Sequence, residues 1–414
     1  MYSFLAPLLI ALTLGYLATL IARLTGTVYI PYLLLLGIIV GPVLYLIKPE
    51  EVATLFYGYV GPIGAAFIIL AESSKIHRYI LRRIIKPLSL LLTFVLFVTG
   101  IATGIIIVLL IKAPVWVGFT VGAIISSTDP ASVITSLRKT KVSEIPSTLL
   151  VTESVFNDPF SYLFLIIVIL IFFPKNISYI QSSPFIFNNL FLYVLITQIA
   201  FPVVIASSLF GLLYFLRIKL PKDFKEYYTG MFLLFGLAAY SLTVTLGGSG
   251  YLAAALFGVL SGNFMPRDRE FENYSLFMDN VSTFAAILIF VFLGASIDLS
   301  VLGGYLIPGV IIALLLIFIV RPFAVVLAGS FGTEIEYGDL LFVGMEGTRG
   351  VFPAILAPTV LIMGIGTGNF LLTYWGKVIE TIVLIIIFTS LTVQPLMMGR
   401  LYKHLHKGEE AKDR

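Results

Sequence analysis

Long apolar runs recur along the whole chain, and each is long enough to cross the hydrocarbon core of a bilayer, which is about 30 Å thick. Only 12% of the residues are charged, whereas a soluble globular protein carries roughly a quarter. A soluble surface would not stay solvated at that charge density over a chain of 414 residues. The sequence therefore predicts an all-α polytopic membrane protein, because a helix satisfies its backbone polar groups within the span.

Charged residues, prolines and glycines divide the apolar runs into thirteen predicted membrane spans. The spans cover roughly residues 2–22, 29–47, 52–74, 87–111, 114–137, 146–173, 187–216, 227–246, 250–264, 275–296, 301–331, 338–365 and 370–399. Glycines four residues apart favour close packing of helices, as at Gly100 and Gly104 or at Gly118 and Gly122.

The basic residues gather in alternate loops of this predicted topology. Twenty lysines and arginines fall in one set of loops and the C-terminal tail, and the opposite loops hold Lys48, Lys112, Lys175 and Lys377. The positive-inside rule then predicts a cell-membrane protein with its N-terminus outside and its C-terminus in the cytoplasm. Orientation and contact with anionic lipid thus explain the pI near 9.0, and we expect no nucleic-acid partner.

Several classes of function are excluded or disfavoured by residues that are absent. The chain has no cysteine, so disulfides and thiolate metal sites are excluded. Its three histidines lie among basic residues outside the apolar runs, which argues against an intramembrane histidine relay. There is no HExxH, GxSxG or Walker sequence, so we expect neither an enzyme nor direct use of ATP, and no cofactor.

Eight charged residues lie inside the apolar runs. Each costs roughly 2.5–3.5 kcal/mol near the bilayer centre on insertion scales, so such groups usually pair with one another or line an ion pathway. They are Glu72, Asp129, Glu153, Asp158, Arg321, Glu346, Arg349 and Glu380.

The fifth span is interrupted at Ser126-Ser127-Thr128-Asp129-Pro130. Proline has no N–H and clashes with the preceding turn, so the carbonyl of Ser126 loses its helical partner. In lipid, an orphan carbonyl is tolerated only where it lines a cavity or is buried in protein. Free carbonyls, hydroxyls and the Asp129 carboxylate together predict an oxygen-rich site for a hard cation, against the simpler interpretation of a proline kink.

The sixth span contains Glu153-Ser154-Val155-Phe156-Asn157-Asp158-Pro159. Residues four apart share a helix face, so Ser154 and Asp158 form one column and Glu153 and Asn157 form the next. We assign the first column to the transported ion, because a buried carboxylate lets protons compete with a metal ion near neutral pH. Glu153 needs a cation beside it, and Arg321 in the eleventh span is the first candidate, since arginine bridges a carboxylate through two contacts.

The twelfth span reads Gly344-Met345-Glu346-Gly347-Thr348-Arg349-Gly350, followed by two prolines, and predicts a second interrupted helix. Glu346 and Arg349 are three residues apart, so either a local structural pair or a functional role remains open. The role of Glu380 in the last span also remains open.

The two predicted interruptions are seven spans apart. This spacing predicts an inverted repeat of spans 1–6 onto spans 8–13, with residues 187–216 as the connector helix. Interrupted helices that meet at the membrane midplane are the arrangement by which many secondary transporters bind ions.

Thr128-Asp129-Pro130, together with Glu153-Ser154 and Asn157-Asp158-Pro159, resembles the monovalent cation/proton antiporter family and its NhaP-like sodium/proton exchanger branch. Val320-Arg321-Pro322 and Gly347-Thr348-Arg349-Gly350 are similar to later signatures of that branch. The resemblance covers nearly the whole chain. It implies the NhaA-like antiporter fold, a homodimer in the bilayer, and exchange of sodium or lithium ions for protons.

Site residues are also implied by the resemblance. It implies ion contacts from Asp158, Ser154, Asp129, the Thr128 backbone and Glu72, and a Glu153–Arg321 bridge supported by Asn157. It further implies a dimerisation panel, residues 1–83 and 227–298, an ion-carrying core, residues 84–173 and 301–400, and a short cytoplasmic tail, residues 401–414.

Asn157 bears on the stoichiometry, because the branch with paired aspartates at this point is electrogenic. With a neutral residue beside a single titrating carboxylate, we expect electroneutral exchange of one sodium ion for one proton. A potassium/proton antiporter and a sodium-coupled solute symporter of similar fold remain alternatives, and a channel is disfavoured by the lack of a repeated filter-like loop.

Overall fold

The computed structural model describes residues 5–48, 52, 56, 58, 61–130, 132–133, 142–174, 189–219, 227–266, 269–331 and 335–405. Every regular element among these residues is helical. Parts of the basic loops predicted from the sequence, residues 138–141 and 222–225, lie outside the described residues, as do residues 406–414 of the predicted tail.

The predicted membrane spans are confirmed as helices. Among the described residues, eight helices are long and apolar enough to cross a bilayer: Leu5–Thr25, Arg78–Ile111, Glu144–Phe172, Phe191–Lys219, Tyr228–Thr245, Arg269–Ser296, Leu299–Gly329 and Phe370–Leu405. Five shorter apolar helices cover Ile30–Val43, Gly61–Ser74, Val115–Ile124, Gly250–Phe264 and Val351–Thr367. Each predicted span overlaps one of these helices, and the two predicted interruptions lie next to short ones, after Val115–Ile124 and before Val351–Thr367.

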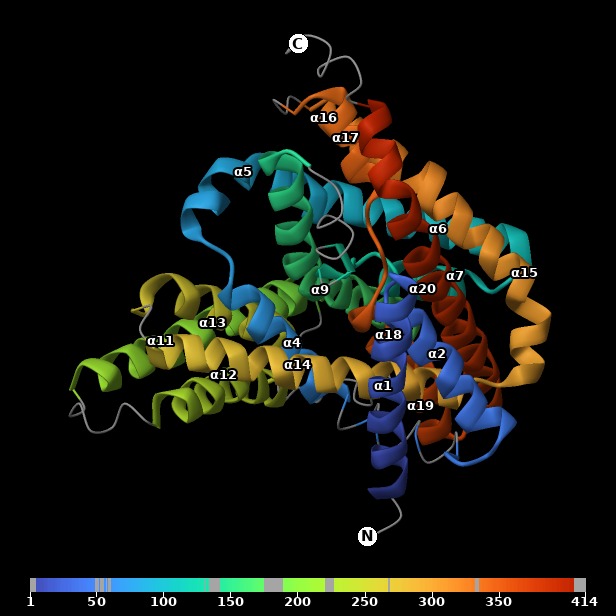
Figure 1. Ribbon diagram of the computed structural model, residues 1–414, viewed down its shortest axis with the longest axis horizontal. Helices are drawn as coiled ribbons and strands as arrows, with labels where there is room; N and C mark the ends of the chain where they lie inside the picture. Colours follow the sequence, from blue (N-terminus) through green and yellow to red (C-terminus); the bar gives the residue numbers. More distant parts are fainter. Residues whose placement is uncertain are drawn as a thin grey trace. The chain divides into compact units, whose positions relative to one another are not determined.

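The chain forms two compact units, and the first comprises Met1–Gly58, Ile84–Ser161 and Ile287–Arg414. Its complete helices, labelled in Figure 1, are α1 (Leu5–Thr25), α2 (Ile30–Ile38), α6 (Leu96–Ile111), α7 (Val115–Ile124), α15 (Leu299–Leu315), α16 (Arg321–Gly329), α17 (Tyr337–Met345), α18 (Val351–Leu356), α19 (Thr359–Thr367) and α20 (Phe370–Leu405). Turns of π-helix at Ile39–Val43, Leu91–Val95 and Leu316–Val320 continue or join these helices.

The second unit comprises Tyr59–Arg83 and Tyr162–Ala286. It contains α4 (Gly61–Ser74), α10 (Leu190–Tyr193), a π-helical segment (Val194–Ala200), α11 (Phe201–Lys219), α12 (Tyr228–Thr245) and α13 (Gly250–Phe264). Helices α11, α12 and α13 pack against one another, and α13 also packs on α4 (Figure 1). The chain passes between the units after Gly58 and again within α5 (Arg78–Leu90), α9 (Glu144–Phe172) and α14 (Arg269–Ser296).

The predicted glycine contacts position the first interrupted helix. A Cβ at Gly122 would lie 2.1 Å from the carbonyl oxygen of Gly100, and one at Gly118 would lie 2.4 Å from that of Gly104. Only glycine permits this approach of α7 to α6, because any side chain would drive the two backbones apart. The glycine pattern therefore holds α7, which ends at the first interruption, directly against α6.

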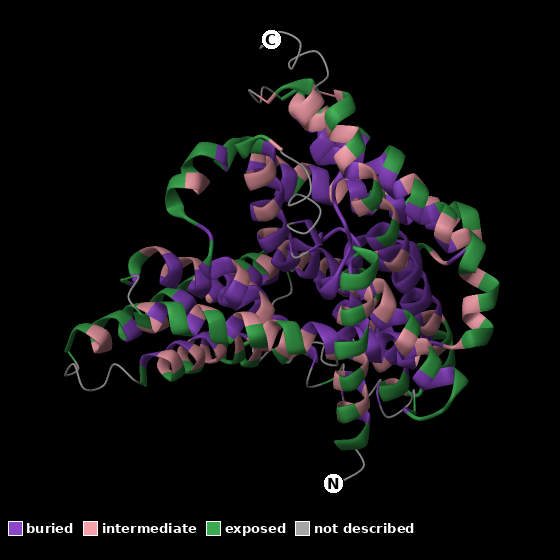
Figure 2. Ribbon diagram, viewed as in Figure 1, coloured by how far each residue is buried: buried purple, intermediate pink, exposed green. Residues whose placement is uncertain are grey.

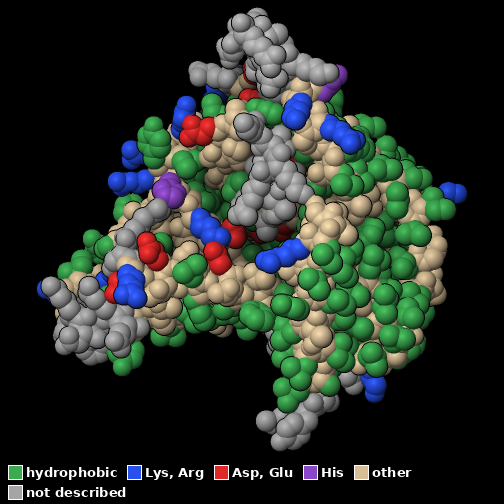
Figure 3. All heavy atoms as spheres, viewed as in Figure 1, with side chains coloured by type: hydrophobic (Ala, Val, Ile, Leu, Met, Phe, Trp, Pro, Cys, Tyr) green, Lys and Arg blue, Asp and Glu red, His purple; other side chains and the backbone are tan. Residues whose placement is uncertain are grey.

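Burial and surface apolarity follow the expectation for a protein that faces lipid. The middle of α20 is buried from Val378 to Ile387, and Figure 2 shows such buried stretches in purple along the helices of the first unit. Large apolar side chains also project outward, as Ile307, Ile319 and Phe323 do on α15 to α16. Figure 3 shows hydrophobic side chains (green) spread over the face where Figure 1 places α15. In water such a surface would be costly, whereas in a bilayer it contacts acyl chains.

Candidate ion-binding site

The two predicted interruptions contact each other inside the first unit. The helical pattern is broken over residues 125–129, after α7, and over residues 346–350, between α17 and α18. The backbone N–H of Asp129 donates to the carbonyl oxygen of Thr348 at 2.8 Å. This bond pairs a free N–H of the first interruption with a free carbonyl of the second, more than two hundred residues away, as buried backbone in a membrane requires.

Asp129 connects the starts of two half-helices. Its Oδ2 accepts from the N–H of Ser132 at 2.8 Å, and its Oδ1 accepts from the N–H of Val351 at 3.4 Å. A Cβ at Gly350 would lie 2.3 Å from the Asp129 side chain, so glycine at this position lets the carboxylate reach α18. A carboxylate is stabilised at a helix N-terminus by free N–H groups and by the helix dipole. Asp129 therefore has a structural task as well as its predicted contact with the ion.

Arg349 supplies the donors that the first interruption lacks. Its Nη1 donates to the carbonyls of Ser126 at 3.2 Å and Ser127 at 2.9 Å, and its backbone N–H donates to Ser390 Oγ at 3.1 Å. The Ser126 carbonyl, which the sequence predicts to lose its helical partner, accepts a hydrogen bond from the Arg349 guanidinium instead. Because this stretch is not helical, the three-residue spacing does not place Arg349 on one helix face with Glu346. Their mutual pairing stays a prediction.

The Thr128 side chain joins the first interruption to α9. Asn157 Nδ2 donates to Thr128 Oγ1 at 2.7 Å, while Asn157 Oδ1 accepts from the Thr128 N–H at 3.2 Å. Ser154 Oγ donates to the carbonyl of Leu150 at 2.9 Å, so the 2.8 Å contact between the two hydroxyls is donated by Thr128. The orientation of every donor in this network is thereby fixed, with Asn157 supplying both a donor and an acceptor.

Asp158 stands apart from this network, although it lies on the same helix. It is 6% exposed, and its Oδ1 has no hydrogen-bond partner among the described residues. A buried carboxylate oxygen without a donor is costly unless a proton or a cation occupies it. The geometry thus leaves Asp158 open to a ligand, while Asp129 is engaged by backbone donors.

Glu153 and Arg321 form the predicted buried ion pair. Nη1 and Nη2 of Arg321 donate to Oε1 and Oε2 of Glu153 at 3.1 and 2.9 Å, and each residue is 2% exposed. Nη2 also donates to the carbonyl of Glu346 at 3.2 Å. A Cβ at Gly347 would lie 2.3 Å from Nε of Arg321, so the glycine of the second interruption makes room for the guanidinium. The pair therefore fastens α9 to both α16 and the second interruption.

Glu72, the fifth predicted ion contact, lies in the second unit near the end of α4. Its Oε1 lies 3.0 Å from Nζ of Lys75, and that ammonium lies 2.8 Å from Oδ1 of Asp279 on α14. The role of Glu72 as an ion contact stays a prediction from the family resemblance.

Two polar residues of α20, which were not among the predicted site residues, contact the second interruption. Ser390 accepts from the Arg349 N–H, and Gln394 Nε2 donates to the carbonyl of Met345 at 2.7 Å. Both are buried, and their spacing of four places them on one face of α20. That pair of polar residues was a usable sequence signal for a contact with broken backbone.

Other polar groups of the first unit lie away from these interruptions. Glu380, whose role the sequence left open, is buried on α20 and accepts a hydrogen bond from Ser296 at the end of α14. Ser296 lines a pocket of about 580 Å³ together with the Asp298–Lys377 ion pair. By its sequence position, Glu380 is ten residues from Ser390, about 15 Å along the helix axis, so it is distinct from the predicted ion site.

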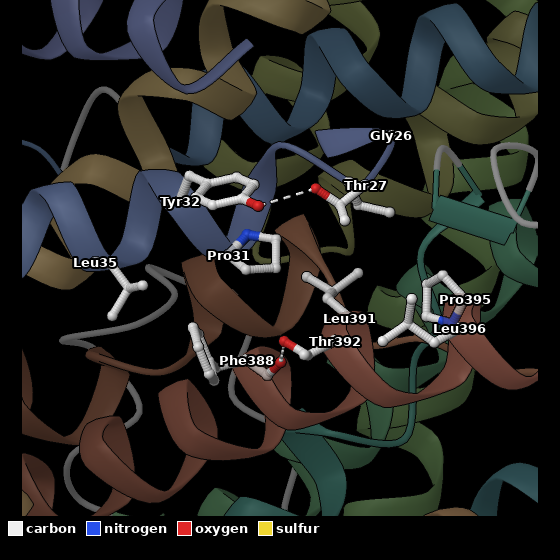
Figure 4. Close-up of a pocket in the computed structure, with 11 residues that line it drawn as sticks. Gly26, Thr27, Pro31, Tyr32, Leu35, Phe388, Leu391, Thr392, Pro395 and Leu396 are labelled. Atoms are coloured by element: carbon white, nitrogen blue, oxygen red, sulfur yellow. Dashed lines mark hydrogen bonds between the residues drawn. The ribbon is translucent and has the colours of Figure 1, made fainter. Parts of the chain in front are cut away.

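A smaller pocket, of about 180 Å³, lies between the α1–α2 connection and the last part of α20 (Figure 4). Its lining is mostly apolar, and the hydroxyl of Tyr32 contacts that of Thr27 at 3.1 Å. None of the charged residues predicted for the ion site lines it.

The sequence matches one protein family and two similar proteins over most of its length. The family described as the transmembrane sodium/hydrogen exchanger matches residues 8–402. The chain is 34% identical over 355 residues to Na(+)/H(+) antiporter 1 of Methanocaldococcus jannaschii, an alignment that covers 85% of this chain and 82% of that protein. It is 28% identical over 374 residues to the probable Na(+)/H(+) antiporter 2 of the same organism, covering 85% of each chain.

Solved structures agree with these matches. The structure of the sodium proton antiporter MjNhaP1 from Methanocaldococcus jannaschii at pH 8 superposes with a TM-score of 0.84 and 31% identity. The superposition covers 98% of this chain and 99% of that one. An electron-microscopy structure of MjNhaP1 gives a TM-score of 0.79 at 30% identity, covering 96% of both chains.

Proposed function

This chain belongs to the sodium/hydrogen exchanger family, in its NhaP-like branch, and we propose that it exchanges sodium ions for protons across the cell membrane. Membership of this family makes the protein a transporter and not an enzyme. Two relatives whose names describe sodium/proton antiport support sodium as the cation, and lithium is the nearest alternative cargo.

The observation that carries the proposal is the buried Asp158 Oδ1, which has no hydrogen-bond partner among the described residues. A carboxylate in that state needs either a proton or a metal ion, and it accepts one at a time. Sodium and protons therefore compete for Asp158, and only the neutralised site crosses the apolar interior, because an unpaired charge there is too costly. Alternating access of such a site couples the two fluxes in opposite directions.

The neighbouring oxygen atoms complete the proposed cation site. Thr128 and Asp129 belong to the first interruption and Ser154 contacts it from α9, and hydroxyl, carbonyl and carboxylate oxygens suit a hard monovalent cation. In this proposal Asp129 holds the two half-helices in place and adds negative charge, while Asp158 takes up and releases the proton. Glu72 is a further proposed contact.

The contacts of Asn157 support a stoichiometry of one sodium ion for one proton. Its amide donates to the Thr128 hydroxyl and accepts from the Thr128 N–H at the same time. An ionised aspartate accepts only, so it would lose the first of these bonds and add a second negative charge. A neutral residue at this position leaves one titrating carboxylate, and exchange moves no net charge.

The family resemblance supports a moving core, a static panel and a homodimer, and the distribution of basic residues supports the orientation of the termini. The predicted core, residues 84–173 and 301–400, would carry the ion past the predicted panel, residues 1–83 and 227–298. We propose a homodimer with its N-termini outside and its C-termini in the cytoplasm.

Proton movement in proteoliposomes tests the function. The purified protein is reconstituted with a pH-sensitive dye inside, and sodium, lithium or potassium is added with and without a potassium/valinomycin voltage clamp. We expect a sodium-dependent pH change that the clamp does not alter. A response to potassium alone would assign a different cargo, and a strong effect of voltage would refute the electroneutral stoichiometry.

A variant of the proposed carboxylate tests the site. Asp158→Asn should fold, elute as the wild-type protein does, and show no exchange. Asp339→Asn, on α17, removes a carboxylate of the same type outside the proposed site and should retain activity. Wild-type exchange by Asp158→Asn would remove Asp158 from the mechanism.

A further inference from the structure

Glu380 is a buried carboxyl group that the proposed ion site does not use. It is 1% exposed, and its Oε1 contacts the hydroxyl of Ser296 at the end of α14. An ionised carboxylate is costly at such burial unless hydrogen bonds or a counter-ion compensate it. The groups that surround Glu380 therefore decide whether it carries a proton.

The hydrogen atom of the Ser296 hydroxyl has two acceptors within reach. Ser296 Oγ contacts Glu380 and also lies 3.0 Å from the carbonyl oxygen of Leu293 in the same helix. A serine hydroxyl has one hydrogen, while a carbonyl and an ionised carboxylate only accept. With Glu380 ionised, one of the two contacts lacks a hydrogen. With Glu380 protonated, the carboxyl group donates to Ser296 and Ser296 donates to Leu293, so both contacts are hydrogen bonds.

A pocket connects this contact with the surface. Ser296 lines the cavity of about 580 Å³, and so do Asp298 and Lys377, whose side chains are 31% and 43% exposed. The lining residues lie at the ends of predicted spans that the positive-inside rule places outside, within residues 42–45, 296–300, 361–365 and 373–377. The Ser296 hydroxyl thus offers a proton a route to Glu380 that avoids both interruptions.

The Asp298–Lys377 ion pair flanks Glu380. Lys377 lies one turn before Glu380 on α20, so its positive charge favours an ionised carboxylate there. Asp298 Oδ2 lies 3.0 Å from Nζ of Lys377 and offsets that charge. The Ser300 hydroxyl and Lys377 lower the pKa of Asp298 to about 2, so Asp298 is ionised at neutral pH and the offset persists.

Few other charged groups come from the elements around this part of α20. Among the described residues, α2, α7, α15, α17, α18 and α19 pack closely on α20, and of these only α17 carries a charge, Asp339. Helix α17 contacts the far end of α20, where Gln394 donates to Met345. Residues 287–296 of α14 carry no charge. Tyrosines on or beside these helices are neutral at neutral pH, namely Tyr32, Tyr45, Tyr305, Tyr337 and Tyr374.

We propose that Glu380 is a proton-binding site separate from the exchange site, filled from the pocket through the Ser296 hydroxyl and tuned by the Asp298–Lys377 pair. The bound proton completes the hydrogen bonds from Glu380 to Ser296 and from Ser296 to Leu293. It thereby fastens the end of α14 to α20 in this conformation.

Helix α20 carries the effect to the exchange site, because Ser390 and Gln394 on the same helix hold the second interruption. A ligand shifts a conformational equilibrium toward the state that binds it more tightly. A proton at Glu380 therefore stabilises this conformation and slows exchange. The proton site itself does not depend on which cation Asp158 binds.

Infrared spectroscopy of the purified protein tests the proton site directly. A protonated carboxyl group has a carbonyl-stretch band of its own, and the Glu380 band should decrease as the pH is raised over about pH 5–9. It should be absent from Glu380→Gln and unchanged in Glu144→Gln, which removes an exposed carboxylate from α9. Asp298→Asn should move the midpoint of the band down by about 0.5–1 pH unit, and Lys377→Gln should move it up by a similar amount.

The kcat of exchange at saturating sodium tests the effect on transport, because saturation removes the competition at Asp158. Wild-type kcat should rise about fivefold as Glu380 loses its proton. Glu380→Gln, whose amide donates to Ser296 as the protonated acid does, should stay at the low value at every pH. Ser296→Ala removes the contact and should stay at the high value.

Each result decides a separate claim. A carboxyl band that is the same in the wild type and Glu380→Gln at every pH would overturn the proton site. Where Glu380→Gln does not fold, the opposite shifts in Asp298→Asn and Lys377→Gln carry the test, and a band that ignores both overturns the site. Equal pH dependence of kcat in the wild type and Ser296→Ala would overturn the effect on exchange. A wild type without sodium-dependent proton movement would refute the proposed function and leave the infrared test of Glu380 valid.

Discussion

Removal of the Glu153 charge should destabilise the protein strongly, because it leaves a buried guanidinium without its counter-ion. Both side chains are 3% exposed, and two hydrogen bonds of 2.9 and 3.1 Å join them. A surface pair would contribute about 0–1 kcal/mol, whereas loss of one partner of a buried pair costs about 3–5 kcal/mol. We therefore expect Glu153→Gln to lower the free energy of unfolding by about 3–5 kcal/mol.

Thermal unfolding of the detergent-purified protein measures this effect. At roughly 1–2 °C per kcal/mol for a chain of this size, the melting temperature of Glu153→Gln should fall by about 3–10 °C. Arg321→Lys keeps the charge but loses the two-point contact, so its melting temperature should lie between those of Glu153→Gln and the wild type. Glu144→Gln removes an exposed carboxylate from the first turn of the same helix and should change stability by about 0.5 kcal/mol or less.

Two results would refute this reasoning. An unchanged melting temperature for Glu153→Gln would mean that water or another group compensates Arg321, and that the pair does not hold α9 to α16. A double variant, Glu153→Leu with Arg321→Met, should be less destabilised than Glu153→Gln alone, since no buried charge then lacks a partner. A double variant less stable than Glu153→Gln would contradict that expectation.

Three further predictions follow from single contacts. Gly350→Ala should abolish exchange and lower the free energy of unfolding by about 1–3 kcal/mol, because its Cβ would overlap Asp129. Gly304→Ala, which has open space around its Cβ, should behave as wild type. Exchange activity and melting temperature are measured for both variants. Arg349→Met should cost about 1–3 kcal/mol in the same melting assay, because two buried carbonyls lose their donor. The Ser300 hydroxyl, together with Lys377, lowers the pKa of Asp298 to about 2. The ionised Asp298 carboxylate therefore stabilises the fold above its unfolded pKa of about 3.9, and this stabilisation is lost as the pH falls through about 2. The wild type should therefore have a higher melting temperature than Asp298→Asn at pH 7, and this difference should shrink between about pH 4 and pH 2. A melting-temperature difference that does not change with pH would contradict the role of the ionised Asp298.

The sequence by itself determined the spans, both interruptions and the Glu153–Arg321 pair. These features follow from local rules, because a bilayer requires long apolar helices and Pro130 and the glycines around Arg349 break them. The Glu153–Arg321 pair could be predicted from the sequence for a related reason. A buried glutamate in lipid requires a cation, and only two basic residues lie inside apolar runs, so few partners were available.

Only the tertiary structure decided which groups meet at the interruptions. Arg349 donates to carbonyls 222 and 223 residues earlier in the chain, and Asp129 receives the N–H of Val351 across a similar interval. Local spacing suggests Glu346 as a partner for Arg349, and that pairing stays a prediction because residues 346–350 are not helical and the spacing argument applies only to a helix. The division of labour between Asp129, held by backbone donors, and Asp158, left without a partner on Oδ1, has the same origin. The sequence predicts both Asp129 and Asp158 as ion contacts although they lie 29 residues apart, and only the packing of distant helix ends shows that backbone donors engage Asp129, whereas Oδ1 of Asp158 has no partner among the described residues.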